Sequence, residues 1–455
     1  MATQSMSEAV LAGASPDELA SISLPTEYLA AHLRVEDEKS LENLEDKDVR
    51  RTLRVGPVPM PELAPDEVLI AVMASSVNYN TVWSATFEPV STFRFLHNYG
   101  REGGWASRHD QPFHALGTDA SGVVVRVGSG VRYWRVGDHV VVNGAAIDEQ
   151  DAMSQMDGML GEHQRAWGYE TNFGGLGHYA IARASQVVRK PAHLTWEESA
   201  SLAACGATAY RMLISDRGAR MKQGDIVLIW GASGGLGAYA IQLVKNGGGI
   251  PVGVVGSETK AAAARALGCD VVINRTDIGI GDDDGSDNAR IIEAGKRLGK
   301  IIRREVGEDP HIVFEHVGRS TFGISVFVVR RGGAVVTCGS STGYEHRFDN
   351  RYLWMNLKRI IGSHVANLQE LAEFTRLCDL GLIAPALSDV YPLAEVGEAV
   401  RLVQLNRHIG KIGVLCLAPE AGLGVTDPAK RAAIGPDALN PLRDFAAAKP
   451  VGSAR

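Results

Sequence analysis

Short apolar runs alternate with glycine-rich turns through the second half of the chain. Residues 226–230 (IVLIW) are all apolar, which is typical of a parallel strand buried on both faces. The glycine-rich stretch 231–237 follows, and then a helix with an apolar side at residues 239–244. Further strands are predicted at residues 250–255, 271–274, 313–314 and 333–339. The pattern predicts an α/β region built on a parallel sheet.

Other β-rich segments flank this region on both sides. Residues 67–76, 114–142 and 176–187 are mostly apolar, with a sharp corner expected at Gly137-Asp138. After the parallel region come a predicted helix at residues 396–405 and a strand at residues 411–416. The order is a small barrel, a nucleotide fold and a return to the barrel. We expect a substrate domain at residues 1–208 joined by 362–455, and a nucleotide domain at 209–361.

The remaining segments carry weaker patterns. Residues 1–50 are predicted to be helical and charged, with a helix start at Ser15, and residues 51–56 to form a strand. A helix is expected at residues 195–204. The tail from residue 418 is rich in Ala, Gly and Pro, so we expect it to be weakly ordered or to wrap a neighbour.

Composition narrows the function classes. The 455 residues suggest two or three domains, and the net charge of −7 gives no support to a nucleic-acid or membrane-surface role. Five cysteines without a CxxC pair argue against a zinc ribbon and a disulfide scaffold. The first residues lack the pattern of a secretory signal, and no apolar run approaches a membrane span. We expect a reduced, cytoplasmic protein.

The strand, glycine turn and helix at 226–245 predict a dinucleotide site, because they aim backbone N–H groups at a pyrophosphate. An NAD site usually has an acidic residue at the end of the next strand. Here Ser257, Lys260 and Arg275 suit a 2′-phosphate, which favours NADPH; Glu258 leaves the acidic alternative open. The full set of expected cofactor contacts is Ser233, Gly234, Gly235, Leu236, Ser257, Lys260, Arg275, His316, Val317, Cys338, Gly339 and Ser340.

A basic amphipathic helix is predicted after a surface loop at residues 276–289. It carries five cations, among them Lys296 and Arg303. They form either a solvated helix face or a phosphate-binding surface for a charged substrate handle.

Four motifs resemble the medium-chain dehydrogenase/reductase superfamily: GTDASGVV at 117–124, GDHVVV at 137–142, GASGGLG at 231–237 and RRGGAVVTCGSSTG at 330–343. The resemblance implies a Rossmann-type parallel sheet plus a GroES-like β-barrel. Gly117-Thr118-Asp119 stands where zinc alcohol dehydrogenases carry Gly-His-Glu, and the four-cysteine lobe is missing. The resemblance therefore implies a zinc-free reductase with no metal requirement.

Longer motifs resemble the crotonyl-CoA carboxylase/reductases over about residues 30–420: VNYNTVW (77–83), FEPV (87–90), WGYETNFGG (167–175), FEHVGR (314–319), FDNRYLWMNLKR (348–359) and IIGSH (360–364). The resemblance implies NADPH-dependent reductive carboxylation of a 2-enoyl-CoA to an alkylmalonyl-CoA, in a homo-oligomer that serves polyketide extender units or acyl-CoA metabolism. It assigns the CO2 site to Asn80, Tyr169, Glu170 and His364. Relatives often have Phe at position 169, a mild change if that residue acts through its backbone N–H.

The chemistry suits these residue types. Hydride addition at Cβ leaves an enolate at Cα, so carboxylation needs CO2 held in place and protons kept away. Neutral donors such as an Asn amide suit CO2, and Glu170 with His364 could fix a bridging water. Ala166 and Val365 stand where relatives can carry Ile and Phe, which indicates room for a medium-chain or branched acyl group.

Two other functions stay open from the sequence. One is a CO2-independent enoyl-thioester or quinone reductase, and the other is a non-enzymatic NADPH-binding protein.

Overall fold

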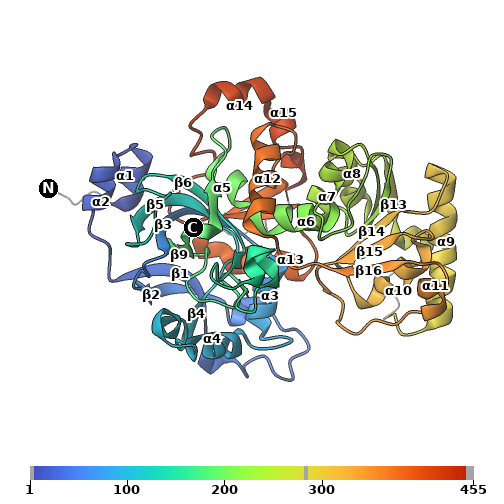
Figure 1. Cartoon of the computed structure of the whole chain (residues 1–455), viewed down its shortest axis with the longest axis horizontal. Helices are drawn as coiled ribbons and strands as arrows, with labels where there is room; N and C mark the ends of the chain where they lie inside the picture. Colours follow the sequence, from blue (N-terminus) through green and yellow to red (C-terminus); the bar gives the residue numbers. More distant parts are fainter. Residues whose placement is uncertain (1–4, 281–284, 447–455) are drawn as a thin grey trace.

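The computed structural model describes residues 5–280 and 285–446, which form two lobes (Figure 1). The lobe at the right of the figure is built on a six-stranded sheet in the order β13-β12-β11-β14-β15-β16. All its neighbouring strands are parallel. The strands are β11 (Ile226–Trp230), β12 (Ile250–Val255), β13 (Val271–Asn274), β14 (Ile312–Glu315), β15 (Ala334–Thr337) and β16 (Arg359–Gly362).

Helices cover both faces of this sheet, as the unbroken apolar strand predicts. Val227 and Ile229 of β11 pack with α6 (Thr208–Leu213) and α7 (Gly235–Asn246). Ile226, Leu228 and Trp230 pack on the opposite side with α9 (Asn288–Val306) and α10 (Arg319–Val328). The helix α8 (Glu258–Ala266) follows β12. The predicted loop before α9 lies partly outside the described residues.

The other lobe is organised around β3 (Glu67–Ser76), all ten of whose residues are buried. The chain returns to it, since β18 (Lys411–Leu415) pairs antiparallel with β3, Gly413 opposite Ser76. This mainly antiparallel sheet has the order β10-β6-β5-β3-β18-β17, with β9 also on β3. Its other strands are β5 (Ser121–Val127), β6 (His139–Val142), β9 (Tyr179–Arg183), β10 (Val187–Arg189) and β17 (Leu387–Pro392).

The prediction that residues 1–50 are helical is only partly correct. Ser15 does cap a helix, α2 (Pro16–Ser21), after α1 (Met6–Leu11). The next element, however, is the strand β1 (Glu27–Arg34), which pairs with β2 (Arg54–Pro59) and β4 (Phe113–Ala115). Both partners lie outside residues 1–50, so the pairing that makes this segment a strand leaves little signal within it. A 3-10 turn also shifts the strand expected at residues 51–56 to β2.

The tail differs from its prediction as well. Residues 418–446 form α14 (Pro428–Ile434), α15 (Pro436–Leu439) and connecting turns on the same chain. Leu439 and Leu442 are buried in the core that contains Tyr239 and Phe374. Arg431 donates a 2.7 Å hydrogen bond to Glu198 of the barrel lobe. Lys430 also pairs with Asp379 at 2.8 Å. Buried apolar side chains and two ion pairs therefore hold a segment whose composition indicated weak order.

Further helices are α3 (Tyr79–Thr86), α5 (Trp196–Ala200), α12 (Leu368–Asp379) and α13 (Val396–Gln404). The helix expected at 195–204 stops at α5, and a π-helical turn (Ala203–Ala207) carries the chain into α6. The remaining α-helices of the described residues are α4 (Thr92–Gly100) and α11 (Asn350–Trp354). Among the described residues, no helix is long and apolar enough to cross a membrane.

Candidate active site at the junction of the lobes

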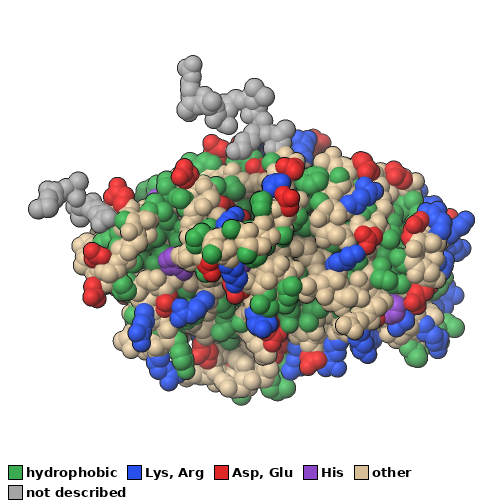
Figure 2. Space-filling view, turned by 90° about the horizontal axis from the view of Figure 1, so that it is seen from above, with side chains coloured by type: hydrophobic (Ala, Val, Ile, Leu, Met, Phe, Trp, Pro, Cys, Tyr) green, Lys and Arg blue, Asp and Glu red, His purple; other side chains and the backbone are tan. Residues whose placement is uncertain are grey.

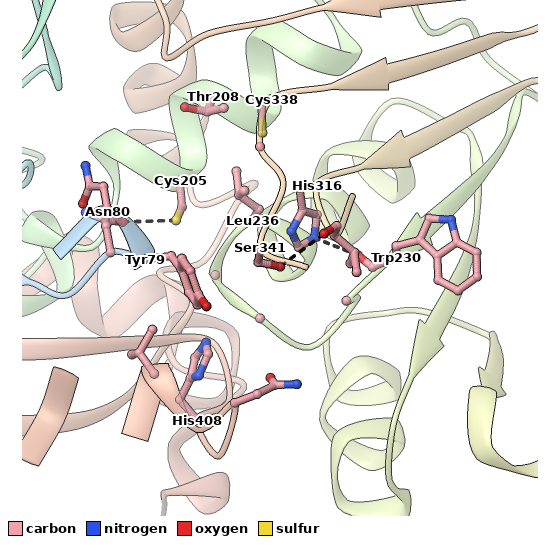
Figure 3. A pocket seen from close by; sticks show the side chains of 18 of the residues that line it. Tyr79, Asn80, Cys205, Thr208, Trp230, Leu236, His316, Cys338, Ser341 and His408 are labelled. Atoms are coloured by element: carbon pink, nitrogen blue, oxygen red, sulfur yellow. Dashed lines mark hydrogen bonds between the residues drawn. The ribbon is translucent and has the colours of Figure 1, made fainter. Parts of the chain in front are cut away.

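A cavity of about 550 Å³ lies where the two lobes meet. In Figure 3, Tyr79 and Asn80 of α3 stand on one side and face Leu236 and His316 on the other. The carboxyl ends of β12, β14 and β15 line the cavity, and this is the edge at which open parallel sheets bind ligands. It brings together Asn80, Ala166, Tyr169, His364 and Val365 with most of the expected cofactor contacts: Ser233, Gly234, Gly235, Leu236, Lys260, Arg275, His316, Val317, Cys338, Gly339 and Ser340.

The glycine turn leaves backbone donors open to this cavity. A Cβ at Gly237 would stand 2.4 Å from the Gly231 carbonyl oxygen, so glycine lets α7 pack close to β11. Gly231 has a φ of +55°, and His316 packs beside it with Nε2 at 2.8 Å from the Trp230 carbonyl oxygen. Gly235 and Leu236, the first residues of the 12-residue helix α7, line the cavity, and a helix N-terminus in this place fits a pyrophosphate.

Two cations occupy the end of β12. Lys260 donates two 2.7 Å hydrogen bonds to Asn406, through the backbone oxygen and Oδ1. Burial and the Arg275 guanidinium lower the pKa of the Lys260 ammonium to about 8, so an anion placed between the two cations would stabilise both charges. Among the described residues that line the cavity there is no Asp or Glu. The site therefore fits a 2′-phosphate.

Two residues near these cations, Ser257 and Glu258, do not take the cofactor-binding positions considered from the sequence. Ser257 does not line the cavity; its hydroxyl caps α8 by accepting from the Lys260 backbone N–H at 3.3 Å. Glu258 points away and pairs with Arg265 at 2.8 Å, so it is not the displaced acidic residue of an NAD site.

The turn from Ala166 to Glu170 closes on itself. The backbone N–H groups of Tyr169 and Glu170 both donate to the Ala166 carbonyl oxygen, at 3.2 and 2.7 Å. Glu170 Oε2 in turn accepts from the Ala166 N–H at 2.7 Å. The Tyr169 N–H, expected to be a free donor, is therefore already engaged. Glu170 lies behind the cavity wall rather than among its lining residues.

His364 stands at the cavity wall close to Glu170. The surrounding protein lowers the pKa of its imidazole by removing water, and the Glu170 charge opposes this shift. Burial raises the pKa of the Tyr169 phenol to about 12, with smaller contributions from Tyr344 and Glu170. Both side chains are therefore neutral near pH 7.

The two residues expected to set acyl size, Ala166 and Val365, both line the cavity. Ala166 is buried, at the end of the short strand β8 (Arg165–Ala166). Val365 has a φ of +46°, a left-handed conformation that is costly for a β-branched residue. Such strain next to His364 is typical of a functional site.

Lys296 and Arg303 do not lie with the other predicted residues. They belong to α9, at the end of the molecule farthest from the barrel lobe, where Figure 2 shows Lys and Arg gathered at the right. Arg303 pairs with Asp309 at 2.5 Å. Neither residue lines the cavity, and a role toward a CoA handle stays a prediction.

Several lining residues were not expected from the sequence: Tyr79, Trp83, Thr118, Cys205, His408 and Lys411. A signal was present for Lys411, a charge at the head of an otherwise apolar strand. Among residues 5–280 and 285–446, no group of three or more His, Cys, Asp or Glu side chains could hold a metal ion.

Two family models match the two lobes. Residues 64–192 match the alcohol dehydrogenase GroES-like domain, and residues 235–380 match the zinc-binding dehydrogenase domain. A crotonyl-CoA reductase of Streptomyces collinus is 49% identical over 95% of this chain and 97% of its own. A crotonyl-CoA carboxylase/reductase of Cereibacter sphaeroides is 39% identical over 82% of this chain and 86% of its own.

Solved structures extend the likeness to three dimensions. A 2-octenoyl-CoA carboxylase reductase, in complex with NADP and 2-octenoyl-CoA, is 64% identical with a TM-score of 0.96, covering 98% of this chain and all of that one. A crotonyl-CoA carboxylase/reductase in complex with NADP is 35% identical with a TM-score of 0.78, covering 88% and 96%.

Proposed function

Because the chain belongs to the crotonyl-CoA carboxylase/reductase family, we propose that it reduces and carboxylates a medium-chain 2-enoyl-CoA with NADPH. The product is an alkylmalonyl-CoA. The observation that carries the proposal is a single cavity joining a 2′-phosphate site to a wall of neutral hydrogen-bond donors.

NADPH, when bound, supplies the hydride for Cβ of the enoyl thioester. The chain's own residues then decide what the enolate at Cα meets. Protonation gives a saturated acyl-CoA, whereas attack on CO2 forms a carbon–carbon bond and a new carboxylate. Holding CO2 and withholding protons are therefore the two tasks of this cavity.

The cavity is lined by weak acids. Burial raises the pKa values of Tyr79, Cys205 and Cys338, and that of Tyr169 to about 12. Burial lowers the pKa of His316, so its imidazole is neutral. Weak acids protonate a neighbouring enolate slowly, which favours carboxylation over simple reduction.

We assign the direct donor to the Asn80 amide. His364, with Glu170 behind it, is the candidate to fix a water that donates to the second oxygen of CO2. The engaged N–H of Tyr169 leaves that residue a wall position, where its ring packs 5.9 Å from Phe95.

A medium-chain acyl group is our choice because Ala166 and Val365 keep the cavity wall small. A further methylene buried there contributes about 0.8 kcal/mol. The relative solved with 2-octenoyl-CoA supports the same size class.

The test is NADPH oxidation with 2-enoyl-CoA thioesters of four to ten carbons, with and without bicarbonate, followed by mass analysis of the products. We expect an alkylmalonyl-CoA from the eight-carbon substrate. Saturated acyl-CoA alone, at saturating CO2, would identify a simple reductase, and NADPH binding without turnover would identify a non-enzymatic protein.

A second copy of the chain is the partner we propose. The edge strand β16 exposes Ile360, and the segment before it exposes Trp354 and Leu357, which is 67% exposed. An apolar patch beside an open strand edge suits pairing with an identical sheet. Light scattering tests this: a homo-oligomer is expected, and a monomer at micromolar concentration contradicts it.

We also propose a domain division and a location for the protein. The domain division is residues 1–208 with 362–455 against 209–361, in line with the parallel strands between 226 and 362. The cytoplasm is the proposed location, since the five cysteines are free thiols, as suits a reducing compartment.

A further inference from the structure

A chain of buried polar groups lies behind Asn80 and begins at Lys411. This lysine is 2% exposed. Its ammonium donates to the Val77 carbonyl oxygen at 2.7 Å, to Asn78 Oδ1 at 2.5 Å and to Asp119 Oδ2 at 3.0 Å. Asp119 also accepts from Ser76 Oγ and from the Ala204 N–H. The Lys411–Asp119 pair is thus buried and fully hydrogen-bonded.

This pair leaves the Asn78 amide only one orientation. An ammonium group can only donate and a carboxylate can only accept. Asn78 Oδ1 therefore faces Lys411, while Asn78 Nδ2 donates to Asp119 Oδ2 at 2.7 Å and to Thr118 Oγ1 at 2.9 Å. Both hydrogens of the Asn78 amide are used.

The hydrogen bond of Thr118 with Asn78 in turn restricts how Thr118 can bond to Asn80. Its hydroxyl accepts from Asn78, so its own hydrogen needs another acceptor, and Asn80 Oδ1 lies at 3.4 Å. The reverse bond, from Asn80 Nδ2 to Thr118 Oγ1 at 3.3 Å, would leave the hydroxyl hydrogen of a side chain that is only 4% exposed without that acceptor. An unsatisfied buried donor is costly. In the first arrangement Thr118 uses only the oxygen of the Asn80 amide, so both hydrogens of its NH2 group stay available to a molecule bound in the cavity, which Asn80 lines.

We propose that Asn78 and Thr118, oriented by the Lys411–Asp119 pair, are positioning residues that make Asn80 a donor to CO2. The inference rests on the proposed function, because it concerns the orientation of the CO2 ligand. It also gives a role to Thr118 and Asp119, which stand where zinc alcohol dehydrogenases have a metal-binding motif. An ordered relay of hydrogen bonds occupies that place here.

Thr118→Val tests the relay with little risk to folding, because valine has a similar shape and the Lys411–Asp119 pair stays in place. The measurement is the ratio of alkylmalonyl-CoA to saturated acyl-CoA at fixed CO2, together with KM for CO2. We expect the ratio to fall about two- to tenfold, the range of one neutral hydrogen bond, and KM for CO2 to rise. NADPH oxidation should fall less than carboxylation. Thr118→Ser keeps the hydroxyl and should restore the wild-type ratio.

A double variant shows whether Thr118 acts through Asn80. In Asn80→Leu there is no amide to orient, so adding Thr118→Val should leave the ratio of Asn80→Leu unchanged. An unchanged ratio in Thr118→Val alone, or a further fall in the double variant, overturns the inference while the proposed function stands. A wild-type enzyme that gives only saturated acyl-CoA overturns both.

Discussion

At the scale of single residues, the side chains placed for the cofactor phosphate differ in charge from those at the proposed CO2 site. The two cations at the end of β12 stand where a cofactor phosphate fits, whereas the side chains of Asn80, Tyr169 and His364 at the proposed CO2 site are neutral. Lys260 is the more informative of the two cations, because burial and Arg275 lower its pKa to about 8. Lys260 is therefore charged near pH 7 but loses its proton in a pH range where an ordinary lysine keeps it, and a bound 2′-phosphate would raise its pKa again.

Lys260→Ala is expected to raise KM for NADPH about tenfold or more, since charge-assisted hydrogen bonds contribute about 1.5–3 kcal/mol. KM for NADH should change little. Lys245→Ala is the matched control, because Lys245 is an exposed residue of α7 that pairs with Asp270. Equal effects on the two cofactors, or a wild-type enzyme that prefers NADH, would contradict the assignment.

The same residue predicts a pH dependence. Below pH 8 the Lys260 ammonium of the free enzyme is charged and attracts the 2′-phosphate; above pH 8 it loses its proton and this attraction. KM for NADPH should therefore rise as the pH passes from 7 to 9, and the rise should vanish in Lys260→Ala. If KM for NADPH depends on pH in the same way in wild type and in Lys260→Ala, a group other than Lys260 titrates in this range.

At the scale of elements, the strands that carry the cofactor site were predictable, and the conformation of the turn at the proposed CO2 site was not. The apolar run of β11 and the glycine turn after it are adjacent in the sequence, so a local pattern is enough to predict both. The Ala166–Glu170 turn depends on backbone hydrogen bonds that no residue pattern specifies, which is why the Tyr169 N–H was expected to be free. β1 was missed for a related reason, because it is defined by pairing with β2 and β4, which lie outside the segment itself.

The short strand β8 and the strained residue after His364 should together set acyl length. Ala166→Ile with Val365→Phe fills the cavity wall, so turnover of an eight-carbon enoyl-CoA should fall at least tenfold more than turnover of crotonyl-CoA, at about 0.8 kcal/mol per excluded methylene. The comparison is kcat/KM for the two substrates. An equal loss on both would show that these residues do not set size.

The C-terminal tail gives a stability prediction. Leu442 is fully buried, so Leu442→Ala should lower the free energy of unfolding by about 2–5 kcal/mol. Leu405→Ala, at a residue 39% exposed, is the control and should cost much less. Thermal or denaturant unfolding measures both. If Leu442→Ala and Leu405→Ala have the same free energy of unfolding, the tail does not pack on the core and is weakly ordered, as its composition indicates.

At the scale of the whole molecule, the cavity exists because the chain leaves the barrel, builds the parallel sheet and returns. Residues 406–411 join the two lobes: Asn406 holds Lys260, the Gly410 N–H donates to the Ser233 carbonyl oxygen at 2.7 Å, and Lys411 anchors Asn78. The order of lobes was visible in the sequence. The convergence of this return segment on both ligand sites was not, because it needs the lobes in three dimensions.

The central claim is that this cavity holds CO2 against the enolate through Asn80. The most direct measurement is the ratio of alkylmalonyl-CoA to saturated acyl-CoA in wild type, Asn80→Leu, Glu170→Ala and His364→Asn, at fixed 13C-labelled bicarbonate. We expect each variant to lower the ratio about two- to tenfold while sparing NADPH oxidation, since one neutral hydrogen bond contributes about 0.5–1.5 kcal/mol. An unchanged ratio with a fall in total NADPH oxidation would contradict the account and assign these residues to hydride transfer or folding.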